Sequence, residues 1–283
     1  MKQMLFYAVG LFSFCFTNAQ DYLNVMTFNV RYNNPRDSLD AWPYRKDFVA
    51  SQILFHEAHI IGVQEVLYDQ MQDLQQRLTR YRYIGVGRED GKQKGEFSAI
   101  FIDTTRLDVL KWQTFWLAPQ TDVPGIKGWD AAITRIVTWA QLKDKKTGKS
   151  FFIFNTHFDH QGKIARRESA TLVLNKVQEI AGSAACILTG DFNAKPDDEP
   201  VKILTEKSNP LHVTDSKELS STPHYGPTGT FNGFRPFERD DQPIDYIFIK
   251  QGFRVSQHAT LSQTWKGKFS SDHFPVFARV EIN

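Results

Sequence analysis

Residues 186–200 read CILTGDFNAKPDDEP, an apolar run that breaks at Gly190 and continues into a polar segment. The first part predicts a buried strand, and Asp191 and Asn193 follow it with one residue between them. Residues two apart on an extended chain point to the same side, so a carboxylate and an amide face one spot at the strand end. These groups can accept a proton from water, hold a hard cation or donate to an anion. Gly, Asp, Asn and Pro also form turns, so an ordinary turn is the alternative.

The segments around this stretch predict the fold class. Strands outnumber helices, and the strands are long, which favours two stacked sheets over a doubly wound parallel sheet. We therefore predict an α/β chain of the α+β type, a four-layer sandwich of two stacked mixed β-sheets flanked by helices. The predicted strands, besides the one above, are 23–30, 59–63, 81–86, 97–102, 106–116, 132–142, 150–157, 244–249, 253–258 and 274–282. The predicted helices are 42–58, 67–78, 164–180 and 200–207, and residues 208–241 are expected to form a loop.

The first residues have the pattern of a signal peptide. Lys2 precedes the apolar run MLFYAVGLFSFCF at residues 4–16, and Thr-Asn-Ala at 17–19 provides a small-residue cleavage site. The run is shorter than the ~20 residues that a membrane span needs, so we expect no transmembrane anchor. We predict a signal peptide at 1–19, one domain at 20–283, and export to the periplasm or the medium. A lipid anchor at Cys15 is the alternative, although Phe14 stands where a small residue is usual.

Cysteine and charge exclude several functions. Only Cys186 follows the predicted leader, which excludes an internal disulfide and a cysteine-based metal site. The net charge of +2 over 283 residues gives no strong field to draw polyanions, so nucleic-acid affinity would need local patches.

Polar and ionisable side chains recur where predicted strands end. Buried charges are costly unless they are paired or bound to metal, so repeated placement at strand ends predicts one shared polar cleft. The residues are Asn29, Glu65, His157 with Asp159 and His160, Asp191 with Asn193, Asp245, and Asp272 with His273.

Six segments in order carry a resemblance that covers residues 23–282. They are TFNVRYNN (27–34), GVQEV (62–66), NTHFDH (155–160), TGDFNAKPDDEP (189–200), IDYIFI (244–249) and SSDHFPVFARV (270–280). Together the segments resemble the endonuclease/exonuclease/phosphatase superfamily, which includes pancreatic-type deoxyribonuclease, inositol-polyphosphate 5-phosphatases and sphingomyelinases. The resemblance implies a divalent-metal-dependent phosphoesterase that cleaves its ester by in-line attack of water.

The resemblance also implies residue roles. Glu65 and Asp272 would lie on the metal, Mg²⁺ or Mn²⁺, with Asn29 positioning the metal or the phosphate; such oxygen ligands suit these ions. The implied catalytic residues are His157, which touches the phosphate; Asp191, which orients or deprotonates water; Asn193, which holds the nucleophile or the transition state; and Asp245, which pairs with His273. A carboxylate partner of this kind raises the pKa of an imidazole.

Substrate contacts are predicted from position alone. Arg135 and Arg31 are candidates for the phosphate, although an ion-paired or solvated arginine is the alternative for Arg135. Trp116, Trp129, Phe231 and Phe234 are candidates for stacking, and a core or rim aromatic is the alternative for each. The substrate is a phosphoester, with nucleic acid, sugar phosphate and phospholipid left open, and no protein partner is implied.

Structural alternatives exist for the other candidates. Asn29 could be a turn residue, Glu65 a helix cap and His157 a satisfied strand-end histidine, while Asp245 could pair with Arg235 or Arg239, and Asp272 with His273 could form a turn. At the level of function, the alternatives are a non-catalytic binding module on the same fold and an exported carbohydrate-binding protein. The enzyme is favoured because every expected position carries a competent residue.

Overall fold

Two six-stranded mixed sheets form the centre of the protein, which we describe from a computed structural model covering residues 21–235 and 242–283. The first sheet has the order β11 (Phe253–Thr260), β12 (Val276–Ile282), β1 (Tyr22–Asn29), β2 (Ile60–Gln64), β4 (Ile100–Asp103) and β3 (Tyr81–Ile84). The second has the order β5 (Leu107–Trp116), β6 (Ile136–Asp144), β7 (Ser150–His157), β8 (Cys186–Asp191), β10 (Asp245–Gln251) and β9 (Thr214–Asp215). The pairs β1–β2 and β7–β8 are parallel, and the remaining pairs are antiparallel.

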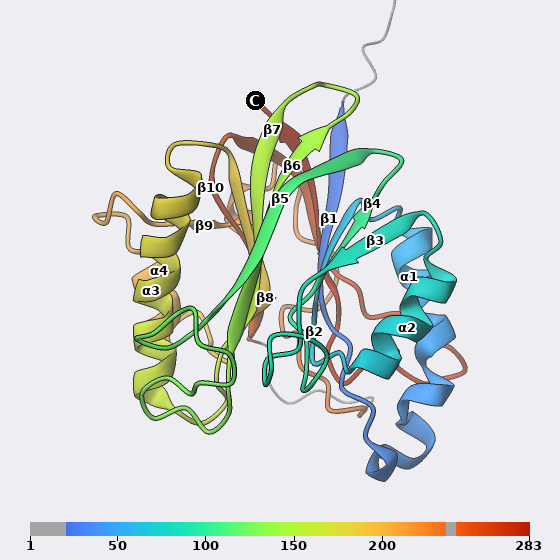
Figure 1. Cartoon of the computed structure of the whole chain (residues 1–283). Coiled ribbons are helices and arrows are strands. Elements are labelled where there is room, and N and C mark those ends of the chain that lie inside the picture. Colours follow the sequence, from blue (N-terminus) through green and yellow to red (C-terminus); the bar gives the residue numbers. More distant parts are fainter. Residues whose placement is uncertain (1–20, 236–241) are drawn as a thin grey trace, which may run out of the picture.

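Helices cover the outer face of each sheet (Figure 1). On the first sheet, α1 (Lys46–Phe55) and α2 (Tyr68–Arg77) bury Ile53 and Leu74 against the sheet. On the second sheet, α3 (Lys163–Ala181) and α4 (Glu199–Thr205) bury Val173 and Leu204. The predicted four-layer sandwich is confirmed.

Several boundaries differ from the predictions. The predicted helix at 42–58 begins as a short 3-10 helix, η2 (Trp42–Tyr44), which contains a proline, and α1 starts only at Lys46. Phe97 forms isolated bridges with Val66 and Gly87 and does not belong to β4. The predicted loop at 208–241 contains β9 and α5 (Ser216–Leu219), elements too short to give a periodic pattern.

Two predictions concern residues outside the described ranges. The signal peptide at 1–19 lies there, and so does Arg239, one alternative partner of Asp245. Within 21–235 and 242–283, no helix combines the length and apolarity that a membrane crossing requires.

The layer between the sheets changes from apolar to polar along the strands. Alternate residues of a strand share a face, so β1 directs Leu23, Val25, Thr27 and Asn29 toward the second sheet. The strand β8 likewise places Ile187 in the same core. The apolar ends are packed, and the polar ends open at one edge of the sandwich, where the candidate site lies.

A buried asparagine joins the sheets just above that edge. Asn155 of β7 donates to the carbonyl oxygens of Val63 and Ala99 at 2.9 Å each, and its Oδ1 accepts from Gln64 Nε2 at 2.7 Å. A buried amide is stable only when its donors and acceptors are paired, as they are here. Asn155 therefore fixes the spacing of the sheets next to the site.

Candidate active site

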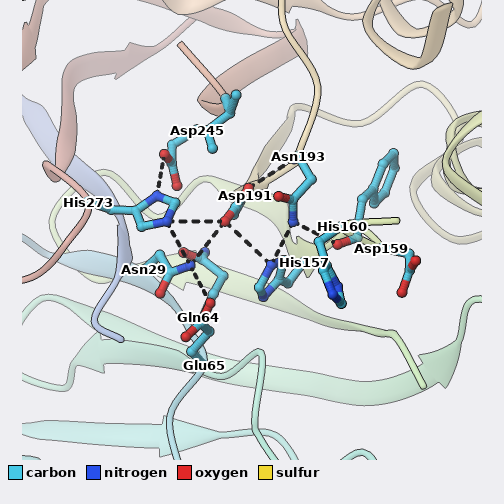
Figure 2. A network of polar contacts seen from close by, with 12 residues as sticks. Asn29, Gln64, Glu65, His157, Asp159, His160, Asp191, Asn193, Asp245 and His273 are labelled. Carbon is cyan, nitrogen blue, oxygen red and sulfur yellow. Dashed lines mark hydrogen bonds and ion pairs between the residues drawn. The ribbon is translucent and has the colours of Figure 1, made fainter. Parts of the chain in front are cut away.

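Strand register places three ionisable side chains side by side. His157 of β7 pairs with Asp191 of β8, and Asp191 pairs with Asp245 of β10. Directly paired residues point to the same face, so all three enter the space between the sheets. From the first sheet, Asn29 and Gln64 end β1 and β2 in matching register. Figure 2 shows Asp191 at the centre of the resulting network.

Asp191 is buried among donors. Its Oδ2 accepts from Asn29 Nδ2 at 3.0 Å and lies 3.4 Å from His157 Nε2 and 3.8 Å from His273 Nε2. Its Oδ1 accepts from the backbone N–H of Asn193 at 2.9 Å. Burial and, next, the charge of Asp245 raise the pKa of Asp191 to about 7, against the lowering effect of His273. A carboxylate with this pKa is suited to take a proton from water near neutral pH.

His273 and Asp245 form a buried pair. His273 Nδ1 lies 2.9 Å from Asp245 Oδ2, which also accepts from the Thr230 hydroxyl at 2.6 Å. Burial lowers the pKa of His273, but the charge and hydrogen bond of Asp245 outweigh burial and hold this pKa well above its usual value. The imidazole is therefore a cation whose Nε2–H faces Asp191.

His157 is the opposite case. Burial, followed by the positive charges of Arg135 and Arg88, holds the pKa of His157 well below its usual value, so the ring is neutral. Its Nε2 accepts from Asn193 Nδ2 at 2.9 Å, and the same amide donates to the Phe158 carbonyl at 3.0 Å. Asn193 is held in place by these bonds, with its backbone at a φ of 46°.

The carboxylates of Glu65 and Asp272 lie beside this network. Glu65 Oε1 accepts from Asn29 Nδ2 at 3.1 Å, whereas Asn29 Oδ1 accepts from the backbone N–H of Arg31 at 3.0 Å. Burial raises the pKa of Asp272, and the charge of Glu65 adds to this rise. Burial thus disfavours the charged form of Asp272, and a hard divalent cation bound between the Asp272 and Glu65 carboxylates would favour that form. Asn29 directs its nitrogen to Glu65, and its role toward a metal stays a prediction.

A second group of potential ligands is formed by Asp191, Asp245 and His273, whose ligand atoms all lie within 4.8 Å of one another. This buried group could bind a metal. A metal at His273 would have to displace the proton that Asp245 stabilises, whereas the carboxylate oxygens of Glu65 and Asp272 are the donor type that a hard cation prefers, so this pair is the better fit.

A cavity of about 1120 Å³ opens over the network. Its lining includes Arg31, Glu65, Arg135, His157, Asp191, Asn193, Asp272 and His273 among the predicted site residues. Asn29 and Asp245 lie behind this lining and contact it through the hydrogen bonds above.

The predicted aromatic contacts separate into two groups. Phe231 and Phe234 line the cavity, and the Phe231 side chain is 47% exposed. Trp116 is buried, with its indole N–H donating to the Arg88 carbonyl at 2.7 Å, and Trp129 is exposed; neither lines the cavity.

Arg135 is a buried arginine whose N–H donors are only partly used. It is only 4% exposed, and its Nη2 donates to His160 Nδ1 at 3.2 Å, while its Nε lies 3.6 Å from Asp159 Oδ1. Within the described residues, its Nε and Nη1 have no hydrogen-bond partner. A buried guanidinium with unpaired N–H groups at a cavity wall can donate hydrogen bonds to an anion that enters the cavity.

The structure also brings in residues that sequence reasoning missed. Thr230 supports Asp245, and Asn232, Tyr32 and Asp37 line the cavity. The segment around Asn232 reaches the site because Phe231 bridges to His273, a contact between non-adjacent segments that leaves no local sequence signal.

Comparison with known proteins identifies the family. The match to the Endonuclease/Exonuclease/phosphatase family extends over residues 26–273. The chain belongs to this family. It therefore has a phosphoesterase fold, as the six segments predicted, and the members of this family are phosphoesterases or nucleases.

Solved structures of family members from Bacteroides superimpose well. One is an endonuclease/exonuclease/phosphatase from Bacteroides vulgatus, with 40% identity, a TM-score of 0.89, and coverage of 93% of this chain and 100% of that chain. Another is a mannosyl-6-phosphatase from Bacteroides thetaiotaomicron, with 39% identity, a TM-score of 0.86, and coverage of 91% and 99%. An uncharacterized protein of Acanthamoeba polyphaga mimivirus is 23% identical over 272 residues, which are 90% of this chain and 98% of the viral protein.

Proposed function

We propose that this protein is a divalent-metal-dependent phosphatase that hydrolyses a phosphate monoester on a sugar or a similar small molecule. The observation that carries the proposal is the Asp191 carboxylate, with a pKa of about 7, set between the neutral His157 and the cationic His273. The 39% identity to a protein named mannosyl-6-phosphatase supports a sugar phosphate as the substrate. The chain would act outside the cytoplasm, as the predicted leader suggests.

The reaction follows from the charges of the site. Asp191 accepts a proton from the attacking water, which the amide of Asn193 orients. As the water oxygen bonds to phosphorus, the ester P–O bond breaks and the leaving alkoxide takes a proton from solvent water. The imidazolium of His273 and the free N–H groups of Arg135 donate to the phosphoryl oxygens, and their charge stabilises the transition state. Asp245 keeps His273 protonated and oriented.

The metal belongs to the same proposal. Glu65 and Asp272 would hold Mg²⁺ or Mn²⁺, which would neutralise charge on the phosphoryl oxygens when bound. Their carboxylate oxygens are the donor type that these ions prefer.

Hydrolysis assays test the proposal. The purified protein should release phosphate from mannose 6-phosphate and p-nitrophenyl phosphate with Mg²⁺ or Mn²⁺, and EDTA should abolish the release. Asp191→Asn and His273→Gln should each lower kcat at least about 100-fold, because each removes a proton-transfer or charge-stabilising group. The exposed Asp122→Asn and the loop variant His212→Gln are matched controls and should retain activity.

Other results would reassign the function. Cleavage of bis-p-nitrophenyl phosphate or a DNA oligomer without monoester cleavage would indicate a diesterase. Phosphate binding without any turnover would favour the binding-module alternative. Binding of unphosphorylated sugar alone would favour the carbohydrate-binding alternative.

A further inference from the structure

One arginine faces three carboxylates at the edge of the candidate metal site. Arg31 Nε and Nη2 donate to the two oxygens of Asp37 at 3.0 and 3.2 Å. Its Nε also lies 3.6 Å from Asp272 Oδ2, and its Nη1 lies 3.9 Å from Glu65 Oε2. Of the three carboxylates, only Asp37 is hydrogen-bonded to the Arg31 guanidinium. The contacts with Asp272 and Glu65 are therefore of charge alone, and those two carboxylates keep oxygen lone pairs for another cation.

Several contacts fix this guanidinium in place. The Arg31 backbone has a φ of 59°, a left-handed conformation that costs a non-glycine residue energy and persists only where the surroundings impose it. The Arg31 carbonyl accepts from Gln70 Nε2 at 2.9 Å, and the guanidinium carbon lies 4.6 Å above the Tyr32 ring. Asp37 is itself held by Asn34 Nδ2 at 2.9 Å. The positive charge is thus built in and not a mobile surface group.

We propose that Arg31, clamped by Asp37, is a fixed charge that limits the Glu65–Asp272 pair to a single divalent cation. The inference rests on the proposed metal-binding function of these carboxylates. Two-ion phosphoesterase sites place their ions ~3.5–4 Å apart between shared carboxylates. Here a guanidinium already lies at 3.6 and 3.9 Å from the two carboxylates, so a second doubly charged ion would meet direct repulsion.

The number of bound ions tests the inference without reference to activity. The EDTA-stripped protein is titrated with Mn²⁺ at pH 7.5 by calorimetry. The wild type should bind one ion per chain. Arg31→Gln, which removes the charge and keeps a hydrogen-bonding side chain, should bind a second ion or bind the first at least ten-fold more tightly. Arg31→Lys keeps the charge and should bind one ion, and the exposed Arg36→Gln is the matched control and should resemble the wild type.

The possible results are distinct. Two ions bound by the wild type, or equal stoichiometry and affinity in Arg31→Gln and the wild type, would overturn the inference and leave the proposed metal site intact. A second ion in Arg31→Lys would also overturn it, because the charge would not be the determinant. Absence of Mn²⁺ binding by the wild type would overturn the metal site and the inference together. Should Arg31→Gln fail to fold, the wild-type count decides: one ion supports the inference and two overturn it.

Discussion

Two buried aspartates on neighbouring strands, Asp191 and Asp245, have different hydrogen-bond partners. Asp245 Oδ2 receives the Thr230 hydroxyl at 2.6 Å and the His273 ring at 2.9 Å, so its charge is directly compensated. Asp191 has weaker partners, and its pKa rises to about 7 because it is buried near the charge of Asp245. Two carboxylates whose environments differ in this way can divide the roles of base and orienting group.

The pH dependence of stability should reveal Asp191 directly. The folded pKa of about 7 exceeds the ordinary value of 3.8, so the folded state binds more protons between these values and the free energy of unfolding falls as pH rises. In EDTA, the free energy of unfolding should decrease between pH 4.5 and 6.5 by about 2 kcal/mol less in Asp191→Asn than in the wild type, because the variant lacks the titrating carboxyl group. Urea unfolding of both proteins at the two pH values measures the difference. Parallel pH profiles would show that Asp191 titrates normally.

At the level of elements, the strand register brings the candidate site residues to one edge of the sandwich, and the sequence pattern predicted this grouping. Polar residues after apolar strands identified His157, Asp191 and Asp245, because a period of two fixes which side chains share a face. Contacts between distant segments were not predictable. Trp116 was a stacking candidate, yet its indole N–H donates to the Arg88 carbonyl. The sequence near Arg31 also gives no sign that its guanidinium is hydrogen-bonded to Asp37.

Gly62 of β2 tests how closely the two sheets must approach. A Cβ at Gly62 would lie 2.3 Å from Thr189 Oγ1 and 2.5 Å from Asn155 Oδ1, inside the polar bridge between the sheets. Gly62→Ala should therefore lower the free energy of unfolding by about 2–4 kcal/mol through overpacking and a lost hydrogen bond. Gly148→Ala is the control, because it has nothing within 4 Å and a φ of +75°, and should cost about 1 kcal/mol of backbone strain. Equal effects of the two variants in urea unfolding would contradict close packing at Gly62.

At the scale of the whole molecule, the candidate site is assembled from both sheets. Asn29 ends β1 and Glu65 follows β2 in the first sheet, and Asp272 lies four residues before β12 of the same sheet. His157 and Asp191 end strands of the second. Separation of the sheets would destroy the site, so a ligand that binds only the assembled site must stabilise the entire fold by mass action.

Divalent cations should accordingly raise the unfolding temperature. A cation at 100 times its Kd adds ~2.7 kcal/mol to the free energy of unfolding, which corresponds to a rise of roughly 5–10 °C for a domain of this size. Thermal unfolding in 10 mM Mg²⁺ and in EDTA measures the shift. Asp272→Asn should lose most of the shift, because it removes a proposed ligand, while the exposed Asp122→Asn should keep it. An equal shift in Asp272→Asn would place the cation elsewhere, with the buried group of Asp191, Asp245 and His273 as the next candidate.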